Sequence, residues 1–131
     1  MRTVLKLEMV LTLTLIEIMI FFDLGPKRIV RTLKKLPVLL FGFSDEDIMR
    51  TISGILYKTV FGMNIFCGNC VRYTYLGYAY LKHRHPDIYI VLGVKRLKGR
   101  ISGHMWLEKC SHIMFEPDNT AERYEKLGEF R

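Results

Sequence analysis

The chain has 131 residues, half of them hydrophobic, three cysteines and a formal net charge of +7. A chain of this length can bury a core of its own, so it needs no disulfides for stability. The odd number of cysteines, and the lack of a cleavage site after the apolar N-terminal segment, argue against a secreted disulfide-bonded protein and favour a reducing cytoplasm. No motif that reads RNA or DNA accompanies the basic segments 1–36 and 82–100, so no nucleic-acid partner is expected.

The most apolar stretch covers residues 4–22 and contains Lys6, Glu8 and Glu17. The uncharged run between these residues is much shorter than the roughly 20 residues that a membrane span needs. We therefore predict a helix that packs on the domain. A short basic helix over 27–36 follows, which is expected to add at most a peripheral contact with an anionic membrane surface.

Two further helices are predicted in the middle of the chain. Ser44 precedes three acidic residues, a pattern typical of a capped helix start, and indicates a helix over 45–60. Gly and Asn residues in 61–69 indicate a loop. Asn69 is a candidate cap for a helix that begins at Cys70 and ends near residue 83.

Beyond residue 86 the hydrophobic period changes from helical to alternating. Residues 88–97 predict a strand, followed by a hairpin turn over 98–100, and residues 104–115 supply one or two more strands. Residues 120–130 predict a short polar helix. The fold class is therefore α+β, in one domain over 1–131 with a helical part (1–60) and a part that holds the Cys70 helix and the sheet (61–131).

The Cys67-x-x-Cys70 pair permits three kinds of chemistry. A thioredoxin-like redox pair needs a strand directly before it, and here the preceding residues are mostly helical. A zinc site is conceivable with Cys110 and His112, although that second pair lies in an apolar strand rather than in a tight turn. The third interpretation is a single cysteine nucleophile.

A nucleophile needs a base, and the base needs an acceptor that orients it. Cys70 at a helix N-terminus is a favourable position for a thiolate and for an oxyanion. His104 on a later strand can serve as the base, and Glu116 or Asp118 can orient it. A helix-borne Cys, a strand-borne His and then a carboxylate, in this chain order, is the arrangement of transglutaminase-like and papain-like enzymes.

Three segments extend this pattern over most of the chain: NCVRYTYLGYAYLKHR, IYIVLGVKR and GHMWLEKCSHIMFEPDNTAERYEKL. They resemble the transglutaminase-like leader peptidases of lasso-peptide biosynthesis, which have a Cys at the start of an apolar helix, a His-x-Trp-x-Glu strand and an acidic residue about twelve positions after the His. The apolar N-terminal helix, with KLEMVLTLTL near its start, is also similar to theirs.

The resemblance implies a cysteine peptidase that removes the leader from a ribosomally made lasso precursor peptide. Cys70 would be the nucleophile, His104 the base and Glu116, or alternatively Asp118, the acid, without a metal or cofactor; Trp106 is expected at the wall of the substrate site. The implied partners are the precursor peptide, a leader-binding protein and a lasso cyclase. The alternatives are a transglutaminase-like acyl-transfer enzyme and a non-catalytic peptide- or membrane-binding module.

Overall fold

The computed structural model describes residues 2–38, 42–59, 68–116 and 122–131. These residues form helices α1 (Arg2–Phe21), α2 (Pro26–Lys35), α3 (Asp45–Thr59) and α4 (Gly68–Leu81), then strands β1 (Tyr89–Leu97), β2 (Arg100–Lys109), β3 (His112–Met114) and β4 (Glu125–Phe130). The strands make one antiparallel sheet in the order β3-β2-β1-β4. The predicted α+β class is confirmed.

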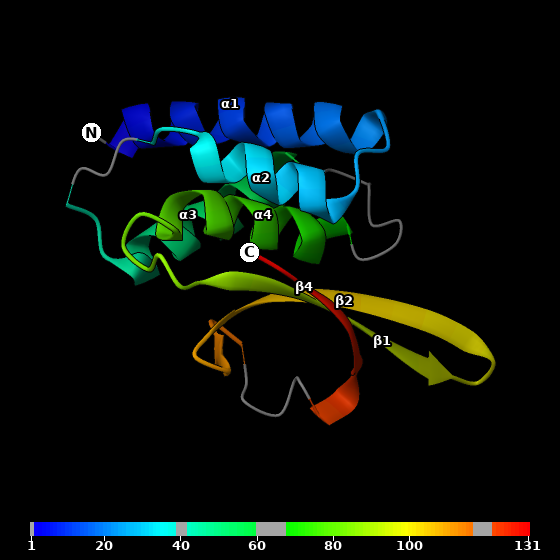
Figure 1. The fold of residues 1–131 in the computed structure, drawn as a ribbon. Helices are drawn as coiled ribbons and strands as arrows, with labels where there is room; N and C mark the ends of the chain where they lie inside the picture. The colour runs from blue at the N-terminus through cyan, green and yellow to red at the C-terminus, as the bar shows by residue number, and fades with distance from the viewer. Residues whose placement is uncertain (1, 39–41, 60–67, 117–121) are drawn as a thin grey trace.

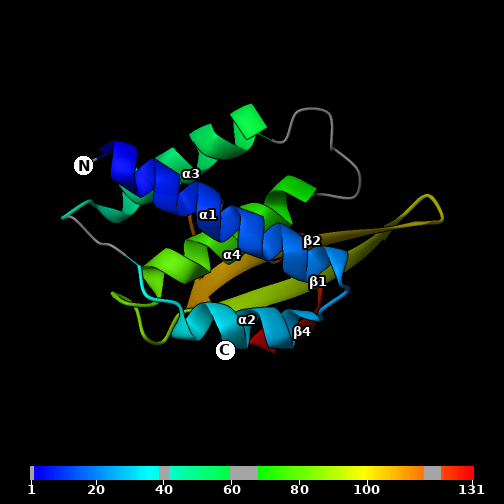
Figure 2. The ribbon, with the colours of Figure 1, turned by 90° about the horizontal axis from the view of Figure 1, so that it is seen from above.

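The helices form a layer on one face of the sheet (Figure 1). Helix α4 lies in the middle of this layer, because it contacts β1, β2 and each of the other three helices. Seen from above, α1 crosses over α4 on the side away from the sheet (Figure 2). One hydrophobic core joins all four helices to Ile90 and Leu92 of β1 and to Met105 and Leu107 of β2. Helix α4 is thus buried between the sheet and α1.

Local sequence signals explain the helix starts. The Ser44 hydroxyl accepts a hydrogen bond from the Asp47 N–H at 3.1 Å, as expected for the cap of α3. Pro26 occupies the first turn of α2, where its missing N–H costs nothing. Helix α4 begins at Gly68 rather than at Cys70, so Asn69 lies inside its first turn and not at the cap position.

Two tight turns connect β1 to β2 and β2 to β3. Lys98 and Gly99 have φ values of 52° and 78°, and Cys110 and Ser111 have φ values of 52° and 64°. Two-residue loops with both φ angles positive match the right-handed twist of antiparallel strands. The predicted hairpin at 98–100 is confirmed, and residues 104–115 contain the expected additional strands.

The prediction of a helix over 120–130 is wrong, because Glu125–Phe130 forms β4. This segment pairs with β1, from Ile90 opposite Phe130 to Val94 opposite Glu125. Its charged residues favour a helix in isolation, but pairing with the free edge of β1 satisfies its backbone and overrides that propensity.

Among the described residues, no helix combines the length and hydropathy that a membrane crossing requires. Helix α1 instead buries one side against the domain. Its buried hydrophobic residues are Leu5, Met9, Leu13, Ile16 and Met19. This placement agrees with the prediction that the apolar N-terminal helix packs on the domain.

Candidate active site

Cys70 lies in the first turn of α4, where its thiol is half-buried. The backbone N–H groups of the first turn of any helix have no partner within the helix, and they face the same end as the positive pole of the helix dipole. A sulfur at this position can therefore be stabilised as a thiolate, and the same N–H groups can receive an oxyanion.

Two contacts fix this end of α4. The Arg72 guanidinium pairs with the Glu17 carboxylate of α1 through Nε and Nη2. The Thr74 hydroxyl donates to the Met105 carbonyl oxygen of β2 at 3.0 Å. The turn that carries Cys70 is consequently held between α1 and the residue next to His104.

His104 faces the carboxylate of Glu116. Its Nε2 lies 2.8 Å from Oε2 and 3.0 Å from Oε1, and both side chains are 19% exposed. The chain reaches this point through Phe115, whose φ of 62° is uncommon for a bulky residue and turns the backbone after β3. The contact expected between His104 and Glu116 is present; the alternative acid, Asp118, lies outside the described residues.

The His104 imidazole also interacts with Cys70. Hydrogen bonds to Cys70 and to Glu116 raise the pKa of His104 to about 9, although burial acts in the opposite direction. Because Nε2 is held by Glu116, Nδ1 is the nitrogen left for the thiol. At neutral pH the ring therefore carries a proton between a sulfur and a carboxylate.

Cys70 and His104 line one pocket of about 370 Å³. Its remaining walls are mostly apolar and come from the start of α4, from Leu92 of β1 and from the first half of β2: Val71, Leu92, Arg100, Ile101, Ser102, Gly103 and Met105. Space for a ligand thus opens directly beside the sulfur and the imidazole.

Trp106 does not lie where the sequence predicted it. It is 2% exposed and packs behind His104, with the two ring centroids 5.7 Å apart, instead of at the wall of the pocket. Tyr124 stacks on the same imidazole at 5.2 Å. These two rings support His104 from the side away from the pocket.

A buried carboxylate holds Trp106 in turn. Glu108, 4% exposed, accepts hydrogen bonds from the Trp106 indole N–H at 3.0 Å and from the Tyr89 hydroxyl at 2.8 Å. The alternation of His104, Trp106 and Glu108 places all three on the same face of β2. The His-x-Trp-x-Glu pattern contains this alternation, but the roles of Glu108 and Tyr124 were not predicted from the sequence.

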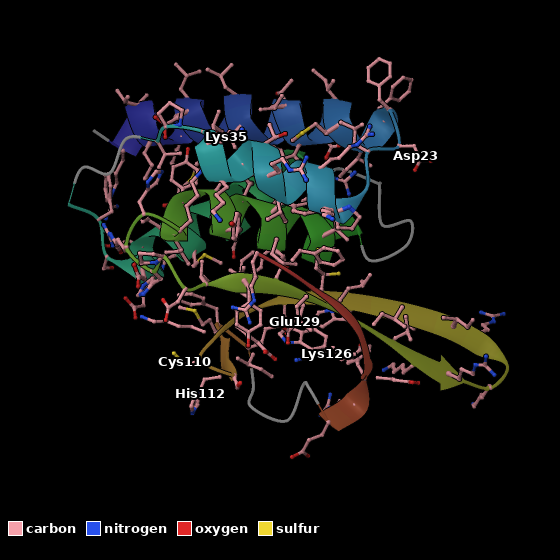
Figure 3. The ribbon with its side chains drawn as sticks, in the orientation of Figure 1. Asp23, Lys35, Cys110, His112, Lys126 and Glu129 are labelled. Carbon is pink, nitrogen blue, oxygen red and sulfur yellow. The ribbon has the colours of Figure 1, made fainter. Side chains whose placement is uncertain are left out.

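Cys110 and His112, the second pair of the zinc alternative, lie far from the His104 site. Cys110 lies in the exposed turn between β2 and β3, and His112 is the first residue of β3 (Figure 3). The Cys110 thiol donates to Asp87, and His112 Nδ1 contacts the Cys110 carbonyl oxygen. Cys110 lies six positions beyond His104 along an extended strand, or roughly 20 Å away. Cys67 is outside the described residues, and within the described part of the chain no group of three or more His, Cys, Asp and Glu side chains is arranged to hold a metal.

Comparisons with protein-family models, with curated proteins and with solved structures find no match to this chain. The arrangement of Cys70, His104 and Glu116 is therefore the ground on which a function is proposed.

Proposed function

We propose that the protein is a cysteine peptidase with a Cys70-His104-Glu116 triad on a transglutaminase-like core. One observation carries the proposal. The His104 imidazole contacts both the Cys70 thiol at the N-terminus of a helix and the mostly buried Glu116 carboxylate, beside an open pocket. A structural ion pair would explain His104 and Glu116, but it would require neither the thiol nor the pocket.

The triad supports acyl transfer in two steps. The Cys70 sulfur attacks the scissile carbonyl carbon, and the first-turn N–H groups of α4 stabilise the resulting oxyanion. The His104 proton then passes to the amine nitrogen as the C–N bond breaks, which leaves a thioester on Cys70. A water molecule attacks the thioester, gives its proton to His104 and displaces the thiolate, which restores the starting pair. Glu116 holds the imidazole in position throughout and stabilises its protonated form.

The sequence resemblance gives the substrate. We infer that the protein removes the leader from a lasso precursor peptide in the cytoplasm, together with a leader-binding protein, and supplies the freed N-terminus to a lasso cyclase. A transglutaminase-like acyl transfer would use the same thioester, with an amine in place of water.

The test uses the precursor peptide and leader-binding protein that the resemblance predicts among neighbouring genes. Mass spectrometry should show cleavage at one peptide bond by the wild type and by Cys110→Ala, a matched control, and none by Cys70→Ala. Cleavage that persists in Cys70→Ala contradicts the peptidase. A product that carries an added amine instead of water assigns acyl transfer, and a folded wild type that binds the peptide without cutting it assigns a binding module.

A further inference from the structure

The edge of β2 beside the pocket has a defined hydrogen-bonding register. The two-residue turn at Lys98 and Gly99 makes Leu97 and Arg100 the first hydrogen-bonded pair of the hairpin. Hydrogen-bonded pairs then alternate along an antiparallel ladder, so Ser102 and His104 bond towards β1. The odd-numbered residues Ile101, Gly103 and Met105 direct their N–H and C=O groups to the opposite edge.

Two independent contacts agree with this register. The same alternation directs Leu107 and Lys109 outward, and β3 pairs with this edge over residues 107–109. The Met105 carbonyl oxygen accepts the Thr74 hydroxyl from the outer side. The outward direction of the odd-numbered residues is thus fixed from both ends.

Part of this edge has no strand beside it among the described residues, because β3 stops at the level of Leu107. Ile101 and Gly103 lie in that part, and both line the pocket that holds Cys70 and His104. An edge strand with free N–H and C=O groups is a template for an extended peptide, which it binds through backbone hydrogen bonds. Here the template borders the pocket that Cys70 also lines.

The side chains around this edge of β2 indicate which kind of peptide would bind to it. The floor of the pocket is apolar, from Leu92, Ile101 and Met105, and Ile101 is 69% exposed. Arg100 adds a guanidinium to the lining, and Arg96 and Lys98 are exposed at the same end. The hairpin that carries them extends beyond the helical layer in both views (Figures 1 and 2). A peptide on this edge would meet an apolar pocket beside Cys70 and positive charge farther along.

We propose that residues 100–105 of β2 bind the substrate as an added β-strand, with an apolar side chain next to the scissile bond and acidic residues along the hairpin. This inference rests on the proposed peptidase activity. It makes the substrate an extended acidic-apolar peptide segment, recognised by its backbone as well as by its side chains.

The first experiment identifies cleavage sites in a proteome-derived peptide library by mass spectrometry. We expect an apolar residue adjacent to the cut bond and enrichment of Asp and Glu on one flank. One well-cut peptide is then synthesised with single amide-to-ester replacements, each of which removes one N–H donor. Because alternate residues of a β-strand bond to the same edge, kcat/KM should fall about fivefold to tenfold at every second position and little at those between.

The second experiment changes the protein. Arg100→Gln should raise KM for the acidic peptide and weaken its dependence on salt, whereas Arg31→Gln, which removes the same charge from the exposed side of α2, should change neither. Cleavage that depends on Cys70 but shows no two-residue alternation in the ester series contradicts the added strand and leaves the peptidase standing. Library peptides that stay uncut while the precursor is cut in the presence of the leader-binding protein contradict recognition by the β2 edge and leave the peptidase standing. A precursor that is also uncut, or is cut equally by Cys70→Ala, contradicts the peptidase and this inference with it.

Discussion

The indole of Trp106 fills the space that a side chain at Gly93 would occupy. A Cβ atom at Gly93 would lie 2.7 Å from Trp106 Cη2 and 2.8 Å from Tyr124 Cβ, which real Cβ contacts do not reach. Gly93 is also the residue opposite His104 in the β1–β2 ladder. The lack of a side chain at one position of β1 therefore lets two aromatic rings close behind the imidazole.

Gly93→Ala should destabilise the protein and disturb the site. Trp106 or the backbone must move to admit the methyl group, and overpacking of this kind costs typically 1–3 kcal/mol in the free energy of unfolding. Urea unfolding measures this cost, and peptide cleavage reports the displaced His104. The matched control is Gly54→Ala in the interior of α3, where no atom of the described residues outside the adjacent helix backbone lies within 4 Å of the added Cβ. That change should stabilise the helix by up to about 1 kcal/mol, and equal destabilisation by both variants would contradict the close approach at Gly93.

Glu108→Gln should weaken the support behind His104. The carboxylate accepts two hydrogen bonds in a buried site, and an amide can accept only through its oxygen. The amide oxygen keeps the Trp106 N–H and the amide NH2 turns to Tyr89, whose hydroxyl must then accept, so two charge-assisted hydrogen bonds become neutral ones, at a cost of about 1–3 kcal/mol in stability. Thermal unfolding measures the loss, with Glu125→Gln as a control at an exposed position of β4. Unchanged stability in Glu108→Gln would show that the buried carboxylate is dispensable.

Glu116→Gln should move the basic limb of the pH profile. Hydrogen bonding to Cys70 and to Glu116 raises the pKa of His104 to about 9, so the proton that the leaving amine needs is lost only near that pH. Removal of the Glu116 charge takes away part of this effect, so the limb in kcat/KM should shift to lower pH. The rate itself should fall roughly 10- to 100-fold, less than in Cys70→Ala, because nucleophile and base remain. If the basic limb of kcat/KM falls at the same pH in the wild type and in Glu116→Gln, Glu116 does not act on the catalytic imidazole.

The outer side of α1 and the neighbouring α2 should bind anionic membranes reversibly. Exposed apolar residues recur three, four or seven positions apart along α1, and exposed cations follow on α2: Val4, Leu7, Leu11, Ile18 and Phe21, then Lys27, Arg28, Arg31, Lys34 and Lys35. Vesicles with anionic lipid should sediment the protein, and roughly 0.5 M salt should release it, because screening removes the contribution of the cations. Arg31→Glu should weaken the binding. Retention that only detergent reverses, or equal binding to neutral vesicles, would contradict this peripheral contact.

Short-range signals made much of the fold predictable. The Ser44 cap and the alternation before the turn at Lys98 and Gly99 depend on neighbouring residues, and the structure contains both. The strand after His104 predicted a carboxylate beside it, Glu116 or Asp118, and the family resemblance favoured Glu116, whose contact with His104 the structure contains.

Long-range pairing explains what the sequence did not predict. Residues 125–130 have the composition of a polar helix, and only the free edge of β1 makes them a strand. Trp106 was expected beside the substrate, but its burial depends on a glycine in another strand and on the Glu108 carboxylate on its own strand. Neither partner can be assigned before the register of β1 and β2 is known.

The most direct test of the triad is the rate at which iodoacetamide alkylates Cys70 as a function of pH. Peptide-level mass spectrometry separates the three cysteines, and Cys110, exposed on its turn, is the internal reference. If the protonated His104 stabilises the thiolate, Cys70 should react faster than Cys110 and be close to its maximal rate by about pH 6. In His104→Ala the same rate should be lower at pH 6 and reach its maximum at a higher pH, shifted towards the ordinary thiol pKa of about 8.5, because only the helix N-terminus then stabilises the thiolate. An identical pH dependence of Cys70 in the wild type and in His104→Ala would contradict the catalytic pair.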